Sequence, residues 1–108
     1  MSEIDKLVTI IRDSKLIEMS IQYDEENSNI KLKLVKNNEL INVNLFDIRE
    51  FQIFDASIKQ EYIGQIKGFL EDSNSYWLSL DPYDERVNEL QDKDNYVFNF
   101  NSYEIIKH

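Results

Sequence analysis

The sequence predicts a mainly β fold, a β-rich α+β domain, and two features of the residue pattern support this. Apolar residues alternate with polar ones along most segments, as in strands that bury one face, and short runs rich in Asn, Asp and Ser separate these segments. The 108 residues, 42% of them hydrophobic, suffice for one packed domain over residues 1–108. We expect an antiparallel meander of six or seven strands, sandwich-like or a curved sheet, with one or two short helices.

The first segments change from a helical to an extended pattern. Ser2 suits an N-cap, and the apolar residues after it recur at helical spacing, which predicts a helix over residues 3–12. From Leu16 the spacing becomes two, and three strands are expected. Their apolar positions are Ile17, Met19, Ile21 and Tyr23, then Ile30, Leu32 and Leu34, and finally Ile41, Val43 and Leu45. Turns at residues 24–29 and 36–39 join these strands into a meander with one wet face. The wet face is lined by Lys31, Lys33, Asn42 and Asn44.

The middle of the chain allows two interpretations. Residues 46–50 have the pattern of a bend or bulge. Within residues 57–70, apolar residues four apart favour a helix, whereas Gly64 and Gly68 each weaken a helix by about 1 kcal/mol relative to alanine. We expect a strand over residues 61–70.

Residues 76–85 hold the only tryptophan and proline of the chain, together with two tyrosines and three carboxylates. Alternation predicts a strand over the first half of this stretch. Asp81 and the proline after it suit the N-cap and first position of a short helix over residues 82–91. Beyond a polar loop, aromatic residues at every second position predict a closing strand over residues 96–101, with a continuation to Ile106 left open.

The charge balance narrows the class of partner. A formal net charge of −9 argues against binding nucleic acid, because that affinity depends on Lys and Arg neutralising phosphates, and it disfavours anionic membrane surfaces for the same reason. The N-terminus lacks the pattern of a signal peptide and no apolar run is long enough to span a membrane, so we expect a cytoplasmic protein. The acidity is concentrated between residues 71 and 94, where only Arg86 and Lys93 oppose the acids. These acids are Glu71, Asp72, Asp81, Asp84, Glu85, Glu89, Asp92 and Asp94.

The residue types exclude several chemistries. There is no cysteine, and the one histidine is His108 at the end of the chain, so no Ser-His or Cys-His pair is expected. Gly64 and Gly68 are too isolated to form a phosphate-binding loop. We therefore expect no enzyme, no catalytic residue, no metal site and no cofactor. The carboxylates of residues 81–94 leave one alternative open, a small carbohydrate- or metal-binding protein or hydrolase.

Aromatic residues beside acidic ones predict a surface that binds a protein, because aromatics are enriched at the centres of interfaces. The candidate partner-binding residues are Tyr76, Trp77, Asp81, Tyr83, Asp84, Glu85, Asp92 and Asp94. We expect a basic protein partner for this surface. A further alternative is a structural subunit of a homo-oligomeric assembly, in which the polar sheet face or an unpaired edge strand packs against copies of itself, and the oligomeric state stays open.

The runs of residues 30–34 and 41–51 resemble small β-rich bacterial proteins, some of which are grouped as immunity proteins of polymorphic toxin systems. The resemblance spans residues 17–54 and the late strand at 96–105, and it includes no catalytic residues. It implies a non-enzymatic intracellular protein that binds and neutralises a basic partner toxin, such as a nuclease.

Overall fold

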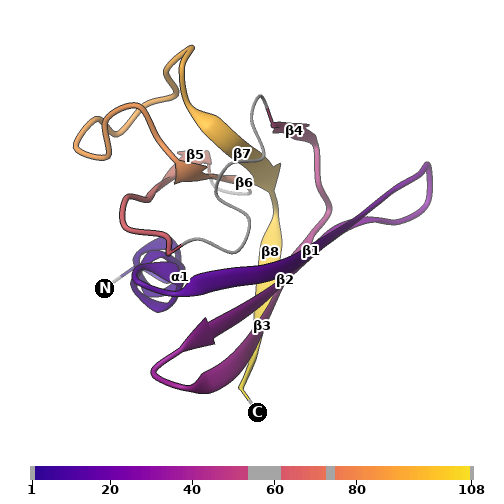
Figure 1. Cartoon of the computed structure of the whole chain (residues 1–108). Coiled ribbons are helices and arrows are strands. Elements are labelled where there is room, and N and C mark those ends of the chain that lie inside the picture. Colours follow the sequence, from indigo (N-terminus) through magenta and orange to yellow (C-terminus); the bar gives the residue numbers. More distant parts are fainter. Residues whose placement is uncertain (1, 54–61, 73–74, 108) are drawn as a thin grey trace.

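The computed structural model describes residues 2–53, 62–72 and 75–107, which form one helix and eight strands in two antiparallel sheets (Figure 1). Helix α1 covers Glu3–Ile11. Sheet A contains, in spatial order, β1 (Lys15–Tyr23), β2 (Ser28–Lys36), β3 (Glu39–Phe46) and β8 (Ser102–Lys107). Sheet B contains β4 (Glu50–Gln52), β7 (Asn95–Phe100), β6 (Ser75–Asp81) and β5 (Lys67–Asp72). The predicted β-rich class is confirmed, and the eight strands exceed the expected six or seven by one or two.

Helix α1 begins and packs as its sequence pattern predicts. The Ser2 hydroxyl accepts a hydrogen bond from the Asp5 amide at 3.2 Å, which satisfies one of the free amides of the first turn. The apolar face is buried against sheet B, where α1 contacts β5. The helix approaches this strand closely at Gly68, since a Cβ atom there would lie 2.8 Å from Ile4 Cγ1 and 2.9 Å from Val8 Cγ2. Gly68 is therefore a packing position.

The meander of β1, β2 and β3 is also confirmed. Strands β2 and β3 join through Asn37 and Asn38, whose φ angles of 53° and 65° place both in the left-handed region. Two-residue hairpin turns of the favoured type need this conformation at both positions, and asparagine tolerates it better than most residues. Lys31 and Lys33 point to solvent on the outer face, as predicted, whereas the apolar rows of β2 and β3 enter the core between the sheets.

The C-terminal segment differs from the single closing strand that the aromatic alternation suggests. Strand β7 belongs to sheet B and β8 to sheet A, and the chain passes from one sheet to the other at Asn101. The Asn101 amide donates to the Phe46 carbonyl at 3.1 Å, which holds the crossing point against the end of β3. Every residue of β7 is buried, and this strand lies between β4 and β6 in sheet B.

The strand expected over residues 61–70 is present only in part. Strand β5 begins at Lys67, while Tyr62 forms an isolated bridge with Lys15 and residues 63–66 are irregular. No helix forms over residues 62–72, and the start of the segment, residues 57–61, lies outside the described residues.

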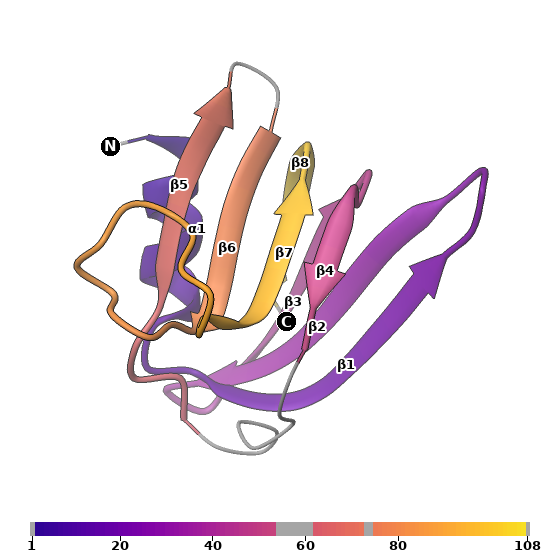
Figure 2. The ribbon, with the colours of Figure 1, turned by 90° about the horizontal axis from the view of Figure 1, so that it is seen from above.

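The short helix predicted over residues 82–91 is wrong. This segment is an irregular loop, and it passes across the face of sheet B opposite α1 (Figure 2). Its proposed N-cap, Asp81, remains the last residue of β6 and pairs with Asn95 of β7, so its carboxylate does not cap a helix.

Candidate functional site

The candidate site is the loop of residues 82–94, which connects β6 to β7 and which we call the 82–94 loop. Irregular loops of this length are uncommon in compact domains and are often functional. Because this loop has no regular secondary structure, its conformation must be stabilised by side-chain contacts, which are described next.

A buried ion pair holds the 82–94 loop against sheet B. The Lys67 Nζ atom lies 2.7 Å from Asp94 Oδ2, and the two side chains are 1% and 0% exposed. The same Asp94 carboxylate accepts hydrogen bonds from the Tyr83 amide at 2.8 Å and the Gln91 amide at 2.7 Å. Lys67 also donates to the Glu89 carbonyl at 2.8 Å. Both ends of the loop are thus tied to one pair of charges, and this arrangement replaces the predicted helix.

Glu85 fastens the loop to a second point, near the end of α1. Its carboxylate lies 2.8 Å from Arg12 Nη1 and also accepts a hydrogen bond from the Ile66 amide at 3.2 Å. The Arg12 guanidinium, followed by the Ile66 amide, holds the pKa of Glu85 below its usual range. The side chain therefore stays ionised in mildly acidic solution.

Asp84 is neutralised within the loop itself. Its two carboxylate oxygens accept hydrogen bonds from Arg86 Nε at 3.0 Å and from Arg86 Nη2 at 3.1 Å. This side-chain contact, together with a bond from the Arg86 amide, lowers the pKa of Asp84. The Arg86 and Asp84 side chains are 87% and 29% exposed, so a competing cation can reach the uncovered part of the Asp84 carboxylate from solvent.

The structure separates the aromatic residues that the sequence groups together. Tyr76 turns toward the core, where its ring centre lies 5.8 Å from that of Phe100, and Trp77 on the opposite face of β6 is only 9% exposed. Tyr83 is 62% exposed, and Lys93 Nζ lies 5.3 Å from the centre of its ring. Of the three predicted aromatics, Tyr83 alone is freely accessible.

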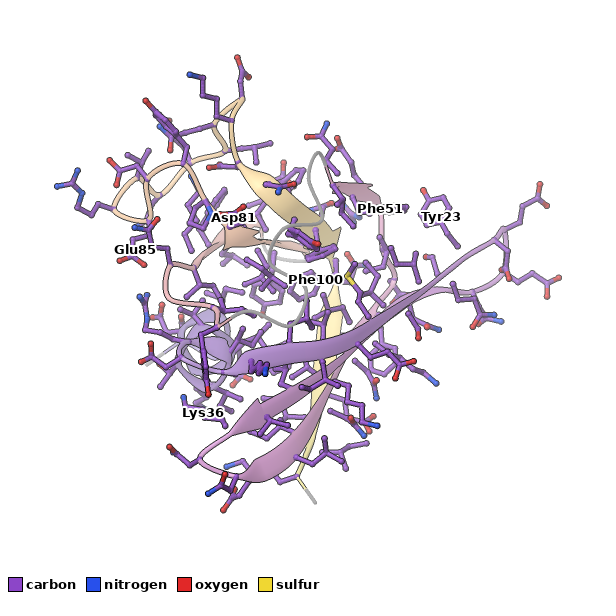
Figure 3. All side chains as sticks on the ribbon, in the orientation of Figure 1. Tyr23, Lys36, Phe51, Asp81, Glu85 and Phe100 are labelled. Atoms are coloured by element: carbon purple, nitrogen blue, oxygen red, sulfur yellow. The ribbon has the colours of Figure 1, made fainter. Side chains whose placement is uncertain are left out.

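The candidate carboxylates do not converge on one point. Asp81 accepts from Asn95 Nδ2 at 3.2 Å beside the sheet, whereas Glu85 lies further out on the loop (Figure 3). Asp94 is buried with Lys67, so it does not belong to the accessible surface, while Asp92 is exposed. Among the residues that the structure describes, no three His, Cys, Asp or Glu side chains are grouped to hold a metal ion. An open hollow is lined by Gln65 and by the loop residues Tyr83, Asp84, Glu85 and Arg86.

Sequence reasoning missed two features. One is Lys67, whose position inside an apolar segment ending in a strand was the available signal that a charge is buried there. The other is a second acidic surface at the end of the β1–β2 hairpin, which the sequence indicates only as a turn. Its acids, Asp24, Glu25 and Glu26, are exposed and form no ion pair with any described residue.

No protein family model, curated protein or solved structure matches this chain. In the described part of the chain, α1 is too short to cross a membrane.

Proposed function

We propose that this is a non-enzymatic binding protein that takes a basic protein partner at the 82–94 loop. The observation that carries the proposal is the buried Lys67–Asp94 pair beneath an exposed tyrosine. Burying two charges costs several kcal/mol of desolvation for each ion, and apolar residues of similar size often stabilise a fold equally well. Such a pair is better explained as a device that fixes the loop in one conformation, which lowers the entropy lost when a partner binds.

The contacts within the loop support a cationic partner group. Lys93 lies over the Tyr83 ring, and Arg86 forms a bidentate contact with Asp84. Both contacts are those that a lysine or arginine of a partner would make, through cation–π attraction and paired hydrogen bonds. The exposed acids Glu89 and Asp92 and the net charge of −9 would attract such a partner at longer range.

The resemblance to immunity proteins of toxin systems supports a toxin as the partner. We propose that the basic partner is a toxin, such as a nuclease, and that binding in the cytoplasm neutralises it. In this proposal binding alone neutralises the toxin, so the chain performs no catalytic step. The carboxylates of Asp84, Glu85 and Asp94 form ion pairs and need no catalytic role.

The first experiment identifies the partner. The immobilised protein is exposed to lysate at low salt and then washed with high salt, and retained proteins are identified by mass spectrometry. A basic protein released by salt is expected, since exposed charges are screened beyond about 8 Å at physiological ionic strength. Retention of no specific protein, or of an acidic one, would count against the proposal.

The second experiment places the partner on the loop by comparing two double variants with equal changes in charge. Glu89→Lys with Asp92→Lys alters the 82–94 loop, and Glu25→Lys with Glu26→Lys alters the hairpin end. All four side chains are exposed and none forms an ion pair with a described residue, so both variants should fold. We expect the loop variant to dissociate at least about tenfold faster, and the hairpin variant mainly to associate more slowly at low salt. Equal effects on dissociation would remove the loop as the contact surface.

A further inference from the structure

Strand β1 has an open edge. It is the terminal strand of sheet A and pairs with β2 on one side. On its other side, the only pairing with a described residue is the bridge from Lys15 to Tyr62. The β1–β2 hairpin extends beyond the rest of the molecule in both views of the ribbon (Figures 1 and 2). As far as the described residues are concerned, the backbone groups of residues 18–23 on this edge are therefore available to another strand.

Within residues 2–53, 62–72 and 75–107, this edge lacks the usual protection against pairing. Proteins commonly blunt edge strands with lysine, proline, short length or a covering element. Strand β4 has three residues, and β5 is in contact with α1. Residues 18–23 contain no lysine or proline, and the bulge of β1 lies before them, between Leu16 and Glu18. Ile21 and Tyr23 are 38% and 56% exposed, and Tyr23 lies beside Phe51 at the far end of the sandwich (Figure 3).

We infer that this edge binds a second copy of the same strand, which joins two molecules through one continuous antiparallel sheet. Opposite residues in an antiparallel pair lie on the same face, so a symmetric pairing must be centred on a residue. Centring on Ser20 places Met19 opposite Ile21 and Glu18 opposite Gln22. The apolar row of one copy then meets the apolar row of the other, and no like charges face each other.

The neighbouring registers are worse. Centring on Met19 draws the bulge at Leu16 and Glu18 into the ladder and requires Lys15, which already pairs with Tyr62. Centring on Ile21 places Glu18 opposite Asp24, and like charges at opposite positions destabilise a pair. The strand is self-complementary in one register, as a two-fold interface requires. A basic segment would find little complementarity here, because Glu18 is the one charged side chain among residues 18–23.

The chain has no cysteine, which allows this register to be tested by cross-linking. In the proposed dimer the two Ser20 residues face each other on the symmetry axis, with Cα atoms about 4.5–5.5 Å apart, within disulfide range. Two Gln22 residues on the same face would be separated by roughly 13 Å, too far for a disulfide. On mild oxidation, Ser20→Cys should therefore form a linked dimer and Gln22→Cys should not. Glu18→Cys and Gln22→Cys should link only when mixed.

Sedimentation of the unaltered chain provides the second readout. We expect dimer formation with rising concentration, favoured by added salt because two chains of charge −9 repel each other. Ile21→Lys should give a monomer with an unchanged circular dichroism spectrum. A chain that stays monomeric at high concentration and high salt, or equal linking of all three cysteine variants, would overturn the inference. Salt should act oppositely on the basic partner, so failure of one proposal can be told from failure of the other.

Discussion

Removing the Asp94 carboxylate is the most direct test of what holds the 82–94 loop. In Asp94→Ala the Lys67 ammonium group, 1% exposed, loses its counter-ion; of its acceptors among the described residues, the Glu89 carbonyl and the Gln91 side-chain oxygen remain. The Tyr83 and Gln91 amides lose their acceptor at the same time. The change therefore affects one buried charge and both ends of the loop.

The magnitude follows from the burial. Breaking a buried ion pair by deleting one partner costs about 3–5 kcal/mol, because the remaining charge is left without compensation. For a domain of this size, a loss of that order lowers the melting temperature by roughly 15 °C or more. Asp92→Ala is the matched control, since Asp92 is an exposed acid of the same loop, and its effect should stay within about 0.5 kcal/mol.

Urea and thermal unfolding followed by circular dichroism would measure these differences. A double variant, Lys67→Met with Asp94→Leu, should lose less stability than the sum of the two single variants, since no charge is left buried. The reasoning would be refuted if Asp94→Ala lost less than about 1 kcal/mol, the range expected of an exposed pair.

Two other contacts make separate predictions. Gly68→Ala should destabilise the fold by about 1–3 kcal/mol in urea unfolding, because its new methyl group meets α1 side chains at 2.8 and 2.9 Å. Gly64→Ala is the control: no atom lies within 4 Å of its new methyl group, so it should be neutral or slightly stabilising. Equal effects of the two substitutions would contradict the close approach of α1. The Arg12 contact lowers the folded pKa of Glu85, so its stabilisation is present above the ordinary carboxyl pKa of about 4.3 and is lost as pH falls through the lowered value. The melting temperature of the wild type should therefore exceed that of Glu85→Gln at neutral pH, and the gap should narrow below about pH 4; a gap independent of pH would mean that the charge of Glu85 does not stabilise the fold.

Residue patterns within a few positions of the chain were enough to predict the elements that are specified by neighbouring residues. The helix after Ser2 and the meander with its turn at Asn37 and Asn38 depend on periodicity and turn chemistry, which lie within a few residues. Alternation also predicted the strand that contains Tyr76 and Trp77. It could not show that both would be largely covered, since burial depends on what packs over each face.

The candidate site could not be predicted in the same way because its contacts join distant parts of the chain. The sequence identifies the acids between residues 71 and 94, but it does not indicate which basic residues pair with them. Arg12 from the end of α1 neutralises Glu85, and Lys67 from β5 neutralises Asp94. The proline after Asp81 favoured a helix locally, and the buried pair overrode that preference.

The passage of the chain between sheets at Asn101 has a consequence for the order of folding. Among the described strands, β4 pairs with β7 alone, and β7 also pairs with β6, so sheet B remains unfinished until residues 95–100 are available. Sheet A likewise gains its fourth strand from the next few residues, when β8 pairs with β3. Because such long-range pairings require large loops to close first, they slow folding. We therefore expect slow folding, in which the meander of β1, β2 and β3 can form before the pairings that involve β7 and β8.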